Sequence, residues 1–111
     1  MRIIEKRMVE AIRSGKSIRC GNTEVCAHGP QSWSVYLHGN HIARASATHA
    51  FEFTLAGWPT ATTRSRINAL LRELGPARAR VYQQRDEQFY TRDVADSEET
   101  FTIGSDVWVH V

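Results

Sequence analysis

Two segments of the chain repeat apolar residues every three or four positions, which is the spacing of one helix face. The first predicts a helix over residues 2–14, and Gly15 is placed to end it. The second predicts a helix over residues 61–74, with Thr60 or Thr62 to cap its start and Gly75-Pro76 to stop it. The apolar positions are Ile4, Met8, Ala11 and Ile12 in the first segment, and Ile67, Leu70, Leu71 and Leu74 in the second.

Elsewhere the apolar residues alternate with polar ones, as in half-buried strands. The alternation is strongest over residues 33–38, and Gly39-Asn40 follows as a two-residue hairpin signal. That turn predicts that His38 pairs with His41. The other expected strands are residues 23–28, 41–45, 51–55, 77–84 and 88–92, and a final pair at 101–103 and 107–111.

The element order predicts a fold of the α+β class in one domain, residues 1–111. The order is α-β-β-β-β-α-β-β-β, and the short turns favour an antiparallel sheet of hairpins with both helices packed on it. Residues 93–100 are expected to form an acidic loop. Trp58, between Gly57 and Pro59, is expected to cover one end of the core. With 111 residues, 41% hydrophobic and 23% charged, the chain has an ordinary globular composition and is too short for a full dinucleotide-binding fold.

Charge and cysteine content narrow the classes of function. The 14 basic and 12 acidic side chains leave a net charge of +2, which is too weak for a nucleic-acid binder driven by charge alone. Cys20 and Cys26 cannot make a four-thiolate zinc site, and with no signal peptide they are expected to be reduced thiols. No apolar run reaches the length of a membrane span. We expect a soluble protein that does not act at membranes.

Histidine and cysteine supply the only candidates for catalysis. His28, His38 and His41 fall near each other in the expected sheet and would make a three-nitrogen metal site. Exposed histidines at hairpin ends are the alternative interpretation. No catalytic cysteine signature, paired carboxylates or phosphate-binding glycine loop is present. We therefore expect no enzymatic activity and no cofactor.

The start of the second helix is a candidate anion or nucleic-acid site. Free backbone N–H groups at a helix start attract phosphate. Hydroxyl and guanidinium groups would add contacts there. Simple capping with solvated arginines is the alternative. The residues are Thr62, Thr63, Arg64 and Arg66.

Exposed aromatic and basic residues are candidates for binding a partner. Arg78, Arg80 and Tyr82 alternate with small apolar residues and are expected to share an outward face. Tyr36 lies on the polar side of its strand, and Trp108 alternates with Val107 and Val109, which are expected to pack inward. An outward tryptophan is a typical interface anchor. An ordinary solvated face is the alternative for each.

Three runs of the sequence resemble a family of small proteins of tailed bacteriophages: residues 21–25, 35–43 and 55–71. The segment Gly57-Trp58-Pro59-Thr60-Ala61-Thr62-Thr63, followed by Arg66 and Asn68, is the most specific part. The resemblance covers about residues 1–92. It implies a viral origin and action in the cytoplasm of an infected bacterial host, and it brings no catalytic residues with it.

Two hypotheses follow for a small phage accessory protein without a catalytic motif. The first is a protein that binds and inhibits host machinery, such as a defence complex of the anti-CRISPR type or the transcription apparatus. Its contact residues would be Tyr36, Arg78, Arg80, Tyr82 and Trp108. The alternative is direct binding of nucleic acid by the basic start of the second helix. A homodimer formed through an edge strand at 107–111 is also compatible with the pattern.

Overall fold

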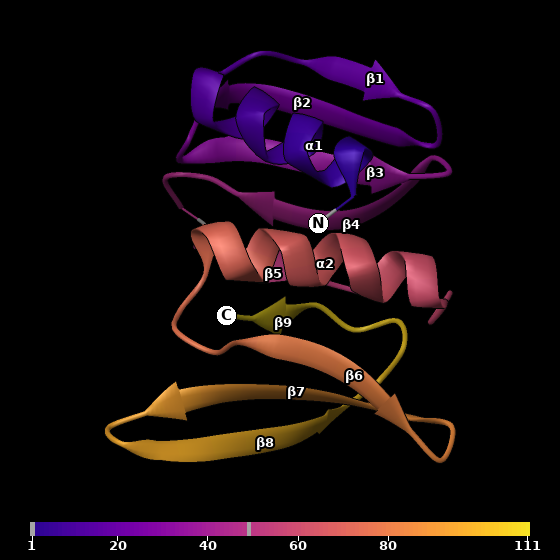
Figure 1. Ribbon diagram of the computed structural model, residues 1–111, viewed down its shortest axis with the longest axis vertical. Coiled ribbons are helices and arrows are strands. Elements are labelled where there is room, and N and C mark those ends of the chain that lie inside the picture. The colour runs from indigo at the N-terminus through magenta and orange to yellow at the C-terminus, as the bar shows by residue number, and fades with distance from the viewer. Residues whose placement is uncertain (1, 49) are drawn as a thin grey trace.

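The computed structural model describes residues 2–48 and 50–111, which form two helices and two antiparallel sheets (Figure 1). The α+β class and the order of helices and strands are confirmed. The helices are α1 (Ile3–Ser14) and α2 (Ala61–Leu74). The six-stranded sheet has the order β1-β2-β3-β4-β5-β9, with β1 (Ile18–Cys20), β2 (Thr23–Gly29), β3 (Ser32–Leu37), β4 (Asn40–Ala45), β5 (Glu52–Phe53) and β9 (Val109–His110). The three-stranded sheet contains β6 (Arg80–Gln84), β7 (Glu87–Val94) and β8 (Ser97–Ile103).

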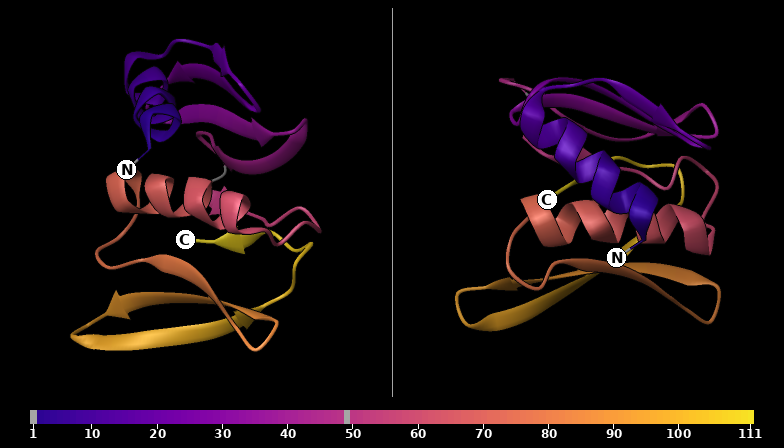
Figure 2. Two further views of the ribbon diagram at one scale, coloured as in Figure 1. Left: turned by 45° about the vertical axis from the view of Figure 1, so that its right-hand side comes forward. Right: turned by 45° about the horizontal axis from the view of Figure 1, so that its top comes forward.

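Both helices lie on the same side of the six-stranded sheet, and the three-stranded sheet lies beyond α2 (Figures 1 and 2). The inward residues of the large sheet meet the apolar helix faces in one core. The small sheet joins this core through Tyr90, whose ring packs edge-on against Phe53 at 5.3 Å between centroids. The outer face of the large sheet is therefore the one that the helices leave uncovered.

The helix ends follow the expected signals. Gly15 ends α1 in the left-handed conformation, with φ of 69°, and its N–H donates to the carbonyls of Ala11 and Ile12. Thr60 caps α2 by accepting a hydrogen bond from the backbone N–H of Thr63. Capping of this kind stabilises a helix by satisfying a donor that has no partner within the helix.

The β3–β4 turn differs from the expected one by one residue. Leu37 pairs with Asn40, and Tyr36 pairs with His41, so the turn residues are His38 and Gly39. Both have positive φ, 51° and 79°, as a tight hairpin turn of this type requires. A bulge follows, and it lets Ile42 and Ala43 both enter the core. The predicted pairing of His38 with His41 was wrong because His38 itself takes the left-handed conformation of a turn residue, so the turn is His38-Gly39 and not Gly39-Asn40.

The C-terminal third contains three further departures. Residues 93–100 are not a loop but the end of a hairpin, in which β7 pairs with β8 around Ala95 and Asp96. The predicted final hairpin is also absent, because β8 pairs with β7 while β9 pairs with β5. Val107, expected to pack inward, is 47% exposed.

The short strand β1 was not predicted, since three residues carry too little alternation to be recognised.

Candidate interaction face of the large sheet

Two rows of paired residues cross the uncovered face of the six-stranded sheet. One row runs from Glu24 through Tyr36 to His41. The other is Cys26, Ser34, Arg44, Glu52 and His110. Cross-strand neighbours share one face of a sheet, so the pairing alone brings side chains from five strands together. We call this surface the outer face.

Three rings and one guanidinium form a continuous group on the outer face. The Tyr36 and His41 rings are stacked, with centroids 4.7 Å apart and planes 21° apart. Trp108 packs edge-on against His41 at 5.0 Å. Cζ of Arg44 lies 3.9 Å from the centroid of the Trp108 ring, within the range of a cation–π interaction. The structure thus brings together Tyr36 and Trp108, two predicted partner-binding residues that are 72 positions apart in the chain.

The carboxylate of Glu52 pairs with two basic side chains of the outer face, Arg44 and His110. Its side chain is only 5% exposed, and its two oxygens lie 3.3 Å from Nε of Arg44 and 3.3 Å from Nδ1 of His110. Glu52 therefore anchors Arg44 against the Trp108 ring and ties the C-terminal strand β9 to the same surface. Glu52 alternates with the apolar residues of segment 51–55, but it is buried rather than solvated.

The imidazole of His41 is kept neutral by its surroundings. Burial lowers the pKa of His41, and the positive charge of Arg44 lowers it further, against a smaller opposing effect of a backbone hydrogen bond. A neutral ring is compatible with its position between Tyr36 and Trp108 and beside a guanidinium. At neutral pH the three rings form an uncharged aromatic surface beside the Arg44 guanidinium, which is already paired to the Glu52 carboxylate.

The predicted anion site at the start of α2 is not assembled. Arg66 is 3% exposed, and its Nη1 donates to Oε2 of Glu5 at 2.8 Å. Thr63 is 1% exposed, and its hydroxyl donates to the carbonyl oxygen of Trp58 at 3.0 Å. Both residues point into the core because they fall on the buried stripe of the helix. They are not available to a phosphate, and the prediction for these two residues was wrong.

Arg64 and Thr62 remain nearer the surface, where both are half-buried. Nη1 of Arg64 donates to the carbonyl oxygen of Pro59 and to the side-chain oxygens of Gln83 and Gln88, at 2.8, 2.9 and 3.2 Å. The guanidinium thereby connects the start of α2 to the β6–β7 hairpin. Its contacts are those of a structural link between the helix and the small sheet.

The other three predicted partner residues form a separate group on the small sheet. Cζ of Arg80 lies 4.8 Å from the centroid of Tyr82, which stacks on Phe89 at 5.3 Å. Arg78 lies before β6 with a φ of 59°, is exposed, and pairs with Asp93 at 3.5 Å. The outward orientation of both arginines is confirmed, since both are exposed while Ala79 between them and Val81 after them are buried. Arg78 does not continue the strand alternation.

The three candidate histidines, His28, His38 and His41, do not converge on a metal centre. His38 is exposed in the β3–β4 turn, with Nε2 3.5 Å from Nδ2 of Asn22, while His41 is stacked on Tyr36. His28 is exposed near the far end of β2. Among residues 2–48 and 50–111 no three His, Cys, Asp or Glu side chains are grouped so as to hold a metal ion. Cys20 and Cys26 are free thiols.

A family model described as the Kyanoviridae Gp96 protein matches residues 1–108, almost the whole chain. The chain belongs to this family. Kyanoviridae are tailed phages, so the resemblance to a tailed-phage protein family is confirmed. The match also takes in the C-terminal residues that the resemblance did not cover, including Trp108. No curated protein and no solved structure matches the chain.

The structure adds to the outer face residues that sequence reasoning missed. His41, Arg44 and Glu52 were not proposed as partner-binding residues. Strict alternation puts Arg44 on the same side as the buried Ile42, and only the bulge in the β3–β4 pairing turns it outward, opposite Ser34. No sequence signal indicated that residues 107–111 pair with β5. Within residues 2–48 and 50–111, neither helix is long and apolar enough to cross a membrane.

Proposed function

We propose that this phage protein acts by binding a protein of its bacterial host, and that the outer face is the contact surface. The observation that carries the proposal is the ring group of Tyr36, His41 and Trp108 with Arg44, displayed on a sheet face that no helix covers. Tyrosine, tryptophan and arginine are enriched at the centres of protein interfaces. Their mutual packing fixes the side chains before binding, which lowers the entropy lost on association.

The charges of the outer face favour a protein partner over nucleic acid. Arg44 lies 3.3 Å from Glu52, and Arg19 lies 3.3 Å from Glu24. Phosphate binding draws its free energy from cations that neutralise phosphates. Arginines already paired to carboxylates contribute little of this kind. We therefore place direct nucleic-acid binding second, as an outcome that the experiment distinguishes.

The proposed consequence of binding is inhibition of the host component by occupying its surface. Such an effect requires no catalytic group, so the protein would be non-enzymatic and would act in stoichiometric amounts. A defence complex of the anti-CRISPR type and the transcription apparatus are the candidate targets. Both are large assemblies in which one covered surface is enough to stop function.

Affinity capture from host lysate tests the proposal, with the wild-type chain and three variants as bait. Trp108→Ala removes the ring that Arg44 covers, and Tyr82→Ala removes the corresponding ring of the small sheet. Lys6→Ala, at an exposed position of α1, is the matched control. Each capture is run with and without nuclease, and each bait is checked for folding by circular dichroism.

We expect one host complex that survives nuclease, is retained by Lys6→Ala and Tyr82→Ala, and is lost with Trp108→Ala. Loss with Tyr82→Ala alone would move the interface to the small sheet and overturn the assignment to the outer face. Recovery that disappears with nuclease would favour nucleic-acid binding. Capture of nothing specific by the wild-type chain would refute the proposed function.

A further inference from the structure

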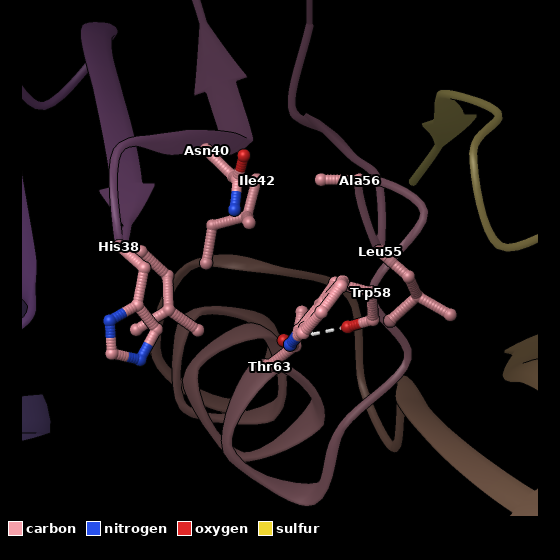
Figure 3. A pocket seen from close by; sticks show the side chains of 8 residues that line it. His38, Asn40, Ile42, Leu55, Ala56, Trp58 and Thr63 are labelled. Carbon is pink, nitrogen blue, oxygen red and sulfur yellow. Dashed lines mark hydrogen bonds between the residues drawn. The ribbon is translucent and has the colours of Figure 1, made fainter.

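A cavity of about 360 Å³ opens on the helix side of the large sheet, away from the outer face. It lies between the β3–β4 turn and the turn that leads into α2 (Figure 3). The β3–β4 side contributes His38 and Asn40, and the opposite side contributes Leu55 and Trp58. The remaining lining residues are Leu37, Ile42, Ala56 and Thr63.

Trp58 does not cover the core as expected, but stands 63% exposed beside this cavity. Its backbone is nevertheless held on both sides. Its N–H donates to the carbonyl oxygen of Leu55 at 2.9 Å, and its carbonyl oxygen accepts from Thr60 N–H at 2.8 Å and from the Thr63 hydroxyl at 3.0 Å. Thr60 and Thr63, which belong to the most specific segment of the sequence, thus fix the position of Trp58.

The turn before Trp58 is fixed as well. Ala56 and Gly57 have φ of 56° and 72°, in the left-handed region. The Ala56 N–H donates to Oγ1 of Thr54 at 3.1 Å, and the Gly57 N–H donates to the carbonyl oxygen of Ser105 at 2.6 Å. An alanine in the left-handed region costs free energy, and backbone strain of this kind clusters at ligand-binding sites. The chain therefore holds a large apolar ring in water on a rigid support.

The lining defines the class of ligand. Leu37, Ile42 and Leu55 give apolar walls, and the Trp58 ring offers a face for stacking. His38 and Asn40 supply a few polar groups at one side, the usual composition of a small-molecule site. A cavity of about 150 Å³ holds benzene, and ligand pockets begin at about 300 Å³. We propose that this pocket binds one planar aromatic ring that carries a hydrogen-bonding group at its edge.

Two sources supply such a ring: a free small molecule and the aromatic side chain of another protein. The probes are therefore indole, cyclohexanol and the blocked tripeptide acetyl-Gly-Trp-Gly-amide. Cyclohexanol matches the polarity of the proposed ligand but lacks a flat π surface. Binding is followed by two-dimensional NMR of the ¹⁵N-labelled chain, which reports on the Trp58 indole N–H and on the backbone amides of residues 37–42 and 55–58.

The matched variants are Trp58→Ala and Trp108→Ala. Each removes one tryptophan ring, Trp58 beside the cavity and Trp108 on the outer face. We expect indole to bind with a Kd of about 0.1 to 1 mM, as a nine-atom ligand of ordinary efficiency does. Trp58→Ala should weaken binding about tenfold, equivalent to about 1.4 kcal/mol. Trp108→Ala should leave the Kd within about twofold.

If the tripeptide binds as tightly as indole, the ring that the pocket recognises belongs to a partner protein. If the tripeptide binds more than about tenfold more weakly, the ring belongs to a free compound. Either result supports the pocket. Shifts centred on residues that do not line the cavity, equal binding of cyclohexanol, or an unchanged Kd in Trp58→Ala would overturn it. Because host capture depends on Trp108 and ring binding on Trp58, failure of one proposal does not imply failure of the other.

Discussion

Nη1 of Arg66 lies 2.8 Å from Oε2 of Glu5, and both side chains are at most 4% exposed. Ser65 donates a second hydrogen bond to the same oxygen at 2.6 Å, and Nε of Arg66 donates to the hydroxyl of Thr23 at 3.0 Å. The ion pair therefore joins α1, α2 and β2 at one buried point. It replaces both sequence-based interpretations of Arg66, an anion site and a solvated side chain, and it gives the first two predictions.

Removing one partner of this pair should strongly destabilise the fold. Glu5→Ala leaves the Arg66 charge buried without compensation, and we expect the free energy of unfolding to fall by about 3 to 5 kcal/mol. Urea unfolding followed by circular dichroism measures the change. Glu73→Ala is the control, because Glu73 pairs with Arg13 at 3.2 Å on the surface and should cost less than about 1 kcal/mol. Equal losses in the two variants would contradict the buried pair.

The same carboxylate should make the protein sensitive to acid. Burial raises the pKa of Glu5, but hydrogen bonds from Ser65 and Arg66 outweigh it and leave the pKa below the ordinary value of 4.5. Ionised Glu5 therefore stabilises the fold fully above pH 4.5, and this stability is lost as the pH falls through the lower, folded-state pKa. Urea unfolding across this range should show a smaller pH-dependent loss in Glu5→Gln than in the wild-type chain. Parallel curves would show that other groups cause the acid response.

Arg44 and Trp108 should be energetically coupled. Because the guanidinium lies 3.9 Å from the ring centroid, a double-mutant cycle of Arg44→Ala and Trp108→Ala should give a coupling of about 0.5 to 1 kcal/mol. The measurement is the free energy of unfolding of the four chains. The pair Arg44 and Tyr82, which lie on different sheets, is the control and should be additive. Additivity in both pairs would mean that the ring and the guanidinium are not in contact in solution.

Asn68 should hold the edge of the small sheet against α2. Its Nδ2 donates to the carbonyl oxygen of Val81 at 2.9 Å, and its Oδ1 accepts from the Val81 N–H at 2.7 Å, so the side chain replaces a neighbouring strand. Asn68→Ala leaves both groups without this partner, and we expect a loss of about 1 to 3 kcal/mol.

Hydrogen exchange separates the two bonds of Asn68. The Val81 amide should exchange faster in Asn68→Ala, while Asn68→Asp keeps an acceptor and should retain most of its protection. The amide of Tyr90, in the middle strand, is the internal reference. Unchanged exchange of Val81 in Asn68→Ala would show that the side chain does not close this edge.

The two helices were predictable because each is encoded locally. Four apolar residues at helical spacing, Thr60 and Gly15 as caps, and the Gly75-Pro76 stop all act within a few positions of one another. The β3 strand was predictable for the same reason, since Trp33, Val35 and Leu37 alternate with polar residues. Such signals depend on local geometry and need no knowledge of the rest of the chain.

The candidate site was predictable only in part. Tyr36 and Trp108 were recognised as outward aromatic residues, but their proximity depends on β9 pairing with β5 across more than fifty residues. Arg66 was misassigned because its partner, Glu5, lies 61 positions away. An isolated arginine at a helix start looks the same whether its partner is a phosphate or a distant carboxylate.

The sequence by itself determined the class of fold, the limits of the helices, most of the strands and the membership of a tailed-phage family. Only the tertiary structure decided which strands became neighbours, which charges were buried and which aromatic rings were left to face water. The physical reason is that periodicity and capping are short-range properties. Strand order, ion pairing and burial instead minimise the free energy of the whole chain, in which residues far apart in sequence compete for the same core.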